Sequence, residues 1–139
     1  DKVSTFIADQ KDRESLSRVV EDQSYDVIID DGHHFMDTQQ VSLGYLFPYL
    51  KPGGVFVIED LHPVDQGFGQ RDHVNNSDAT LEVLAALKEN RPIVTPHLLA
   101  HEVEYLRANI GHMYVREINR ESIIAFIIKR SAARTTKAA

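Results

Sequence analysis

Two short apolar segments constrain the fold of this 139-residue chain more than any other feature. Residues 25–30 and 55–58 are rich in β-branched side chains, and a pair of acidic residues ends or follows each run. Continuous apolar runs of this kind are typical of strands that are buried on both faces, as in parallel sheets. Between them, residues 37–50 have the apolar spacing of a helix, which Pro48 should kink or shorten. The order strand, helix, strand predicts an α/β fold with parallel strands.

The same patterns predict the other elements of the chain. They are a strand at residues 3–8, helices at 14–21, 78–89 and 95–109, and two further strands at 112–118 and 122–129. A turn at Asn119-Arg120 should join the last two strands into an antiparallel hairpin. Ser77 is the expected N-cap of the helix that follows it, residues 62–76 are expected to form a lid-like loop, and residues 131–139 a disordered tail. We therefore expect one domain over residues 1–130.

Composition excludes several classes of protein. The chain has 15 Lys and Arg against 21 Asp and Glu, mixed along its length, and its formal net charge is −6. A nucleic-acid-binding domain would need a basic stripe, so none is expected. The absence of cysteine excludes disulfides and thiolate metal sites, and we expect a cytoplasmic protein. No apolar run approaches the roughly 20 residues of a membrane span, so no membrane association is expected.

The acidic residues at the ends of the two runs are the strongest candidates for a functional site. Ligands of parallel α/β sheets bind at the carboxyl ends of the strands, which is where Asp31, Glu59 and Asp60 are expected. Carboxylates that converge repel one another unless a cation lies between them, and oxygen ligands suit Mg²⁺. Such an ion would lower the pKa of a bound substrate hydroxyl. His34, which Gly32 allows to turn back over the strand end, could then remove the proton.

Other interpretations of these residues stay open. Each acidic pair alone could cap the following helix and remain solvated, although two pairs beside two adjacent histidines favour a catalytic site. The same side chains could activate water in a metal-dependent hydrolase or hydroxylase. The domain could also be a non-catalytic α/β module for assembly or signalling. A receiver-like module would need a lone aspartate and a lysine on a later strand, whereas the run 55–58 is followed by two acids.

Several segments resemble the class I methyltransferases that modify sugars of macrolides and related glycosides. The segments are Asp30-Asp31-Gly32-His33-His34, Glu59-Asp60-Leu61-His62, Lys51-Pro52-Gly53-Gly54 and Asp9-Gln10-Lys11-Asp12. The first two are the most specific, while the third is shared by many class I methyltransferases. The family commonly has serine at the position of His33 and glycine at that of Ala8. The resemblance is good over about residues 6–62.

This resemblance implies a Rossmann-like class I methyltransferase sheet, of which the chain would form the C-terminal part. It implies that Asp31, Glu59 and Asp60 bind Mg²⁺ and that His34 is the general base. The implied reaction is metal-assisted transfer of a methyl group from S-adenosylmethionine to a hydroxyl of a sugar or glycosylated natural product. The implied substrate is a small-molecule glycoside, and a homo-oligomer is expected because members of the family often associate.

The resemblance also implies a cofactor site. Asp9 and Gln10 would lie near the adenine of S-adenosylmethionine, and Asp30 near its methionine portion. The family's Gly-rich turn after its first strand, and the second strand that ends in an acid, have no counterpart in this sequence. In the family those strands lie between the segments that correspond to residues 3–8 and 25–30. We therefore expect the sequence to be part of a longer chain. Alone, it should be inactive and bind cofactor poorly, or assemble with another copy.

Overall fold

One mixed sheet forms the centre of the computed structural model, which describes residues 3–20, 23–61, 79–119 and 122–132. Its strands are β1 (Tyr25–Asp30), β2 (Leu50–Leu61), β3 (Ile110–Glu117) and β4 (Ile123–Lys129), in the order β1-β2-β4-β3. β1 and β2 are parallel, whereas β4 is antiparallel to both β2 and β3. The α/β class, the neighbouring parallel strands and the final hairpin are thus confirmed.

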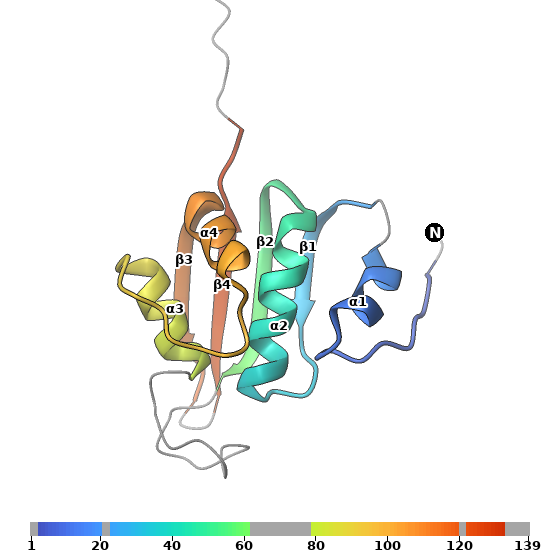
Figure 1. The fold of residues 1–139 in the computed structure, drawn as a ribbon, viewed down its shortest axis with the longest axis horizontal. Helices are drawn as coiled ribbons and strands as arrows, with labels where there is room; N and C mark the ends of the chain where they lie inside the picture. Colours follow the sequence, from blue (N-terminus) through green and yellow to red (C-terminus); the bar gives the residue numbers. More distant parts are fainter. Residues whose placement is uncertain (1–2, 21–22, 62–78, 120–121, 133–139) are drawn as a thin grey trace, which may run out of the picture.

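The described helices are α1 (Arg13–Val20), α2 (Met36–Leu46), α3 (Thr80–Lys88) and α4 (Ala100–Asn109), with a short 3-10 helix, η1 (Phe47–Tyr49), after α2. α2, α3 and α4 cover one face of the sheet, and α1 packs against α2 beyond the edge strand β1 (Figure 1). Pro48 lies in η1, so the predicted helix at 37–50 ends early, as its proline required. The predicted helix at 95–109 begins only at Ala100, because residues 96–98 form a bend.

The cross-strand register determines which side chains meet the helices. Ile28, Phe56, Ile127 and Met113 occupy one row across the sheet, and Phe56 and Ile127 are completely buried in the core. Leu43, Phe47, Leu84 and Leu106 from the helical segments pack into the same core. Side chains alternate between the two faces along a strand, so the adjacent row points away from the helices.

The opposite face of the sheet is apolar and partly open. Ile29, Val57, Phe126 and Tyr114 form one row on it. The exposed fraction is 59% for both Ile29 and Tyr114, and Val27, two residues before Ile29, is 51% exposed. A run that reads as buried on both faces is therefore covered on only one in the described part of the chain.

The strand predicted at residues 3–8 is wrong, because the segment pairs with no described strand. Its residues are all exposed, and Ile7 is fully so. A strand is stabilised by hydrogen bonds and cross-strand contacts with a neighbour. β1 is an edge strand of the described sheet, and the segment does not pair with it. The β-forming residues of this segment therefore do not make it a strand by themselves.

A buried ion pair joins the start of α1 to α4. Arg13 donates from Nε and Nη2 to the two carboxylate oxygens of Glu102, at 2.7 Å each, and Nη2 also donates to the carbonyl of His97. Glu102 is only 4% exposed and also accepts a hydrogen bond from the amide of Leu99. A Cβ on Gly44 would lie 2.7 Å from Glu102 Oε2, so only glycine lets α2 approach this carboxylate.

A second buried cation secures the segment between α2 and β2. Lys129 is 8% exposed, and its Nζ donates to the carbonyls of Pro48 and Leu50 at 2.7 Å each. The same ammonium group lies 5.9 Å from the ring centre of Phe47 and 5.3 Å from that of Tyr105. A buried lysine requires such partners, because losing its hydration is costly. Lys129 therefore fixes the end of the helix at the point where the chain enters the sheet.

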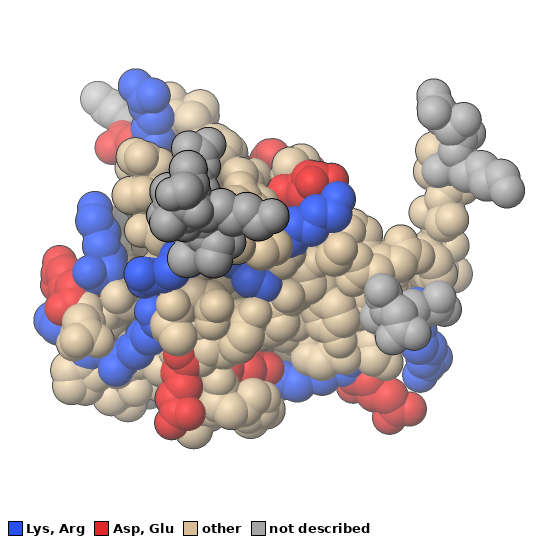
Figure 2. Space-filling model, turned by 90° about the horizontal axis from the view of Figure 1, so that it is seen from above, with Lys and Arg blue, Asp and Glu red and all other residues tan. Residues whose placement is uncertain are grey.

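Some predictions lie outside the described residues. They concern the lid-like loop at 62–76, the Ser77 cap, Arg120 of the turn and residues 133–139 of the tail. The ends of the hairpin are nevertheless close, because the amides of Ile118 and Asn119 both donate to the carbonyl of Ser122. Among the described helices, none combines the length and hydropathy needed to cross a membrane. Basic and acidic side chains are interspersed on the face seen in Figure 2.

Candidate metal and cofactor site

Three predicted site residues converge at the carboxyl ends of β1 and β2. Asp31 follows β1, His34 precedes α2, and Asp60 lies near the end of β2. His34 Nε2 is 3.9 Å from Asp31 Oδ1 and 3.9 Å from Asp60 Oδ2. One ligand atom from each of the three residues lies within 4.8 Å of the others. The parallel pairing of β1 with β2 therefore brings together side chains that are 29 positions apart in the sequence.

The backbone is unusual at two of these three residues. His34 has φ of 58° and Asp60 has φ of 50°, which is the left-handed region that residues with a side chain seldom occupy. The positive φ is at His34 and not at Gly32, whose role differs from the one expected from the sequence. Such conformations cost of order 1–3 kcal/mol each and cluster at functional sites. Their presence in two adjoining segments supports a functional role for this group.

β2 is irregular at the two adjacent acids Glu59 and Asp60. The pairing of β2 with β4 changes register between Ile58 and Leu61, which is the signature of a bulge. Consecutive side chains of a regular strand point to opposite faces, so only one of two adjacent acids is expected to face the site. Glu59 is not part of the described group; its backbone carbonyl accepts a hydrogen bond from Gln39 Nε2 at 3.4 Å. The metal-binding role predicted for Glu59 stays a prediction.

The donor set of this group fits a hard divalent cation. Asp31 and Asp60 offer carboxylate oxygens, the ligands that Mg²⁺ prefers, and Mg²⁺ sites usually retain water or substrate oxygens as further ligands. Asp31 is exposed and the other two residues are partly exposed, so the site is open to solvent and to a substrate. Asp60 Oδ1 also accepts a hydrogen bond from Ser122 Oγ at 2.6 Å. That contact leaves Oδ2 as the oxygen facing His34.

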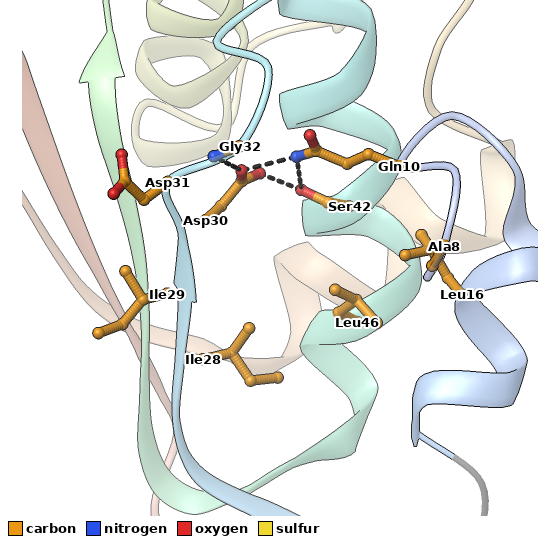
Figure 3. A pocket seen from close by; sticks show the side chains of 10 residues that line it. All are labelled: Ala8, Gln10, Leu16, Ile28, Ile29, Asp30, Asp31, Gly32, Ser42 and Leu46. Carbon is orange, nitrogen blue, oxygen red and sulfur yellow. Dashed lines mark hydrogen bonds between the residues drawn. The ribbon is translucent and has the colours of Figure 1, made fainter. Parts of the chain in front are cut away.

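Beside this group, Gln10 and Asp30 form a hydrogen-bonded network with Ser42 (Figure 3). Gln10 Nε2 donates to Asp30 Oδ1 at 2.6 Å and lies 3.4 Å from Ser42 Oγ. Ser42 donates to the other oxygen of Asp30, and the amide of Gly32 donates to Oδ1. Gln10 Oε1 in turn accepts from the amide of His33 at 3.1 Å. The side chain of Asp31 points away from this network in Figure 3.

Burial determines the electrostatics of Asp30. Its side chain is 7% exposed, and loss of hydration raises the pKa of this carboxyl above its ordinary value. Hydrogen bonds from Ser42, Gln10 and the amide of Gly32, together with the charge of His34, oppose that rise without cancelling it. Both carboxylate oxygens of Asp30 accept hydrogen bonds from the protein, so this side chain connects the end of β1 with α2 and with Gln10.

The cavity next to the network measures about 330 Å³. Its lining combines the polar residues Gln10, Asp30, Asp31, Gly32 and Ser42 with the apolar residues Ala8, Leu16, Ile28, Ile29 and Leu46. Of the three residues predicted for a cofactor site, Gln10 and Asp30 thus lie together at this cavity, and Asp9 does not line it. Asp9 is exposed and forms a local turn, in which its Oδ1 accepts from the amide of Lys11 at 2.9 Å.

Two residues of the site were not identified from the sequence. Ser42 and Ser122 contact Asp30 and Asp60, respectively. The partners are 12 and 62 positions apart, and a serine in a helix or at a hairpin has no distinguishing pattern in the sequence. Only the helical phase of α2, which places Ser42 toward β1, could have suggested the first of these contacts.

Comparison with known proteins finds relatives among O-methyltransferases. It is 37% identical over 89 residues to the mycinamicin VI 2''-O-methyltransferase of Micromonospora griseorubida, which covers 62% of this chain and 22% of the relative. It is 36% identical over 81 residues to the demethylmacrocin O-methyltransferase of Streptomyces fradiae, covering 57% of this chain and 20% of that protein. The chain thus spans about a fifth of the length of these curated relatives. No protein-family model matches it.

A solved structure supports the same relationship over nearly the whole chain. MycE, a methyltransferase from the mycinamycin biosynthetic pathway solved in complex with Mg, SAH and mycinamycin VI, has a TM-score of 0.66 and 28% identity. The match covers 97% of this chain and 34% of MycE. The hydrolase, hydroxylase and non-catalytic interpretations find no support in these comparisons. The four-stranded α/β domain is therefore related to part of the macrolide and sugar O-methyltransferases and has the fold of a class I methyltransferase.

Proposed function

We propose that this protein transfers a methyl group from S-adenosylmethionine to a hydroxyl of a sugar in a glycosylated natural product. The convergence of Asp31, His34 and Asp60 on one point carries this proposal. The relatives support it, because they are named as methyltransferases of mycinamicin VI, demethylmacrocin and rhamnosylated tetracenomycin. MycE was solved with Mg and SAH, the cofactor product expected from such a reaction.

Each residue of the group has a distinct task in this proposal. Asp31 and Asp60 would hold Mg²⁺, which, when bound, lowers the pKa of an acceptor hydroxyl and orients it. His34 would take the proton from that hydroxyl, since an imidazole is an efficient base near neutral pH. Its Nε2 lies 3.9 Å from an oxygen of each carboxylate, so the base would stand directly beside the bound hydroxyl.

The cavity lined by Gln10 and Asp30 would take part of the cofactor. Its mixed lining of aliphatic and polar groups suits a nucleoside with an amino acid arm, and it adjoins Asp31 of the proposed metal pair. Most of the rate enhancement would come from alignment of the acceptor oxygen with the methyl group, because the sulfonium makes the methyl reactive by itself. Asp9 would act near the cofactor only if it moves toward this cavity.

Substitution of His34 separates two roles, because the imidazole could instead be a metal ligand. Asparagine is the informative replacement, since it tolerates the left-handed backbone found here. If His34 is the base, His34→Asn in the full-length protein should lower kcat by at least about 100-fold and leave Mg²⁺ affinity unchanged. If it is a ligand, both should fall. Calorimetric Mg²⁺ titration and transfer of labelled methyl to a panel of glycosides measure the two quantities.

Two further variants complete this experiment. Asp31→Asn should weaken Mg²⁺ binding and turnover together, whereas His101→Asn, an exposed histidine on α4, should change neither. Full turnover by His34→Asn would refute the assignment of the base. The expected association of copies and the cytoplasmic location stay predictions, which analytical ultracentrifugation and cell fractionation can measure.

A further inference from the structure

We propose that Gln10 is a positioning residue that clamps the turn carrying Asp31 and His34, and that it does not act chiefly as a cofactor ligand. This inference rests on the proposed function, because it concerns the geometry of the proposed metal site. Gln10 lies after the N-terminal segment, and 20 or more residues separate it from the groups that it contacts.

Both ends of the Gln10 amide are engaged. Nε2 donates to Asp30 Oδ1 at 2.6 Å, and Oε1 accepts from the amide of His33 at 3.1 Å. Asp30 is the last residue of β1, and His33 directly precedes the left-handed His34. Gln10 therefore bridges the two ends of the segment that contains Asp31. A hydrogen bond to a buried carboxylate is stronger than one between neutral groups, which makes the first contact a firm anchor.

Gly32 lies directly against the Gln10 amide. A Cβ added to Gly32 would overlap with Gln10 Oε1 and would lie 3.0 Å from Gln10 Cδ. Gly32 has no positive φ, so a side chain at this position would meet no backbone strain but would displace the Gln10 amide. The backbone at Asp31-Gly32 thus lies in close contact with the side-chain amide of Gln10.

The loop that carries Gln10 is itself tied to the helix after the turn. Lys11 Nζ lies 2.5 Å from Asp37 Oδ2 in the first turn of α2, and Asp37 Oδ1 accepts from the amide of Thr38. Ser42, one turn further along α2, donates to the other oxygen of Asp30. The segment between β1 and α2 is therefore held at both ends. Gln10 and Ser42 contact Asp30 at its beginning, and Lys11 contacts Asp37 just after its end. A clamp of this kind would define the direction of His34 Nε2.

The test uses calorimetric Mg²⁺ titration of the full-length protein and hydrogen exchange of the His33 amide. Gln10→Ala should weaken Mg²⁺ binding by about 10- to 100-fold, the usual effect of removing a group that orients metal ligands. It should also accelerate exchange of the His33 amide, which loses its acceptor. Gln23→Ala, which alters an exposed glutamine, is the matched control and should change neither quantity.

A double-mutant cycle shows whether the contact itself is responsible. Gly32→Ala should weaken Mg²⁺ binding because its methyl group displaces Gln10, and the double variant with Gln10→Ala should bind no more weakly than Gln10→Ala alone. Effects that simply add would overturn the clamp, as would a Gln10→Ala variant that binds Mg²⁺ normally but S-adenosylmethionine poorly. If the unsubstituted protein binds no divalent ion, the proposed metal site fails. In that case unchanged exchange at His33 in Gln10→Ala overturns the clamp, and faster exchange supports it.

Discussion

Removing the hydroxyl of Ser122 should weaken the proposed metal site without disturbing the fold. Ser122 Oγ lies 2.6 Å from Asp60 Oδ1, while Oδ2 of the same carboxylate faces His34. In Ser122→Ala the carboxylate of Asp60 loses the hydrogen bond that fixes its side-chain torsion angle. The residue lies at the beginning of β4 and is partly exposed, so alanine leaves no large cavity.

The expected magnitude follows from the kind of contact that is lost. Groups that hydrogen-bond to metal-ligating carboxylates typically contribute about 10- to 100-fold in metal affinity. That range corresponds to roughly 1.4–2.8 kcal/mol of binding free energy. A hydrogen bond to a charged group contributes about 1.5–3 kcal/mol, which agrees with it. We expect Mg²⁺ and Mn²⁺ affinities to fall by the same factor, because Asp60 supplies an oxygen ligand to either ion.

Isothermal titration with Mg²⁺ at constant pH measures this affinity directly. Ser122→Thr retains the hydroxyl and should bind within about threefold of the unsubstituted protein. Ser17→Ala, which removes a hydroxyl that donates to the carbonyl of Glu14 on α1, is the control at a partly exposed position outside the metal group. Equal affinities for Ser122→Ala and the unsubstituted protein would show that Asp60 is not held by this contact, or that it is not a ligand.

Three further predictions concern stability, measured as the free energy of unfolding in urea. The pKa of Asp30 is raised, so its stabilising contribution is fully present below the ordinary carboxyl range and is lost as pH rises through the raised value. The free energy of unfolding of the unsubstituted protein, relative to that of Asp30→Asn, should therefore fall with rising pH. A rise instead would contradict this. Arg13→Met leaves Glu102 buried without its cation and should cost about 3–5 kcal/mol, with a loss below about 1 kcal/mol as the refuting result. Lys129→Met retains the apolar stem but leaves two backbone carbonyls without donors and should cost about 2–5 kcal/mol; an unchanged unfolding midpoint would show that water replaces the ammonium group.

The convergence of Asp31 with Asp60 was predictable because it depends on strand order. Two apolar runs joined by one helix are expected to be parallel neighbours, and parallel neighbours end at the same edge of a sheet. The sequence predicts both Glu59 and Asp60 as metal ligands, and the structure places Asp60 in the described group with Asp31 and His34. The register change of β2 against β4 at these two acids was not predictable, because β4 lies more than 60 residues further along the chain.

The predicted strand at residues 3–8 failed for a related reason. A short run of β-forming residues such as 3–8 describes a local preference, but a strand also needs a partner whose backbone hydrogen bonds it can complete. Contacts between distant residues were equally hidden. Nothing in the neighbourhood of Arg13 or Gly44 indicates that both adjoin Glu102, and nothing near Ser122 indicates its bond to Asp60. Periodicity reports which face of an element is buried, and not which partner it meets.

The open side of the sheet also affects how preparations of this protein are to be judged. Dyes that fluoresce in apolar surroundings are commonly used to recognise collapsed, loosely packed states. The row formed by Ile29 and Tyr114, with Val27 nearby, would bind such a dye even when every helix is correctly packed. A fluorescent sample of these 139 residues is therefore no sign of misfolding, and near-ultraviolet circular dichroism of the five tyrosines is the better criterion of a native state.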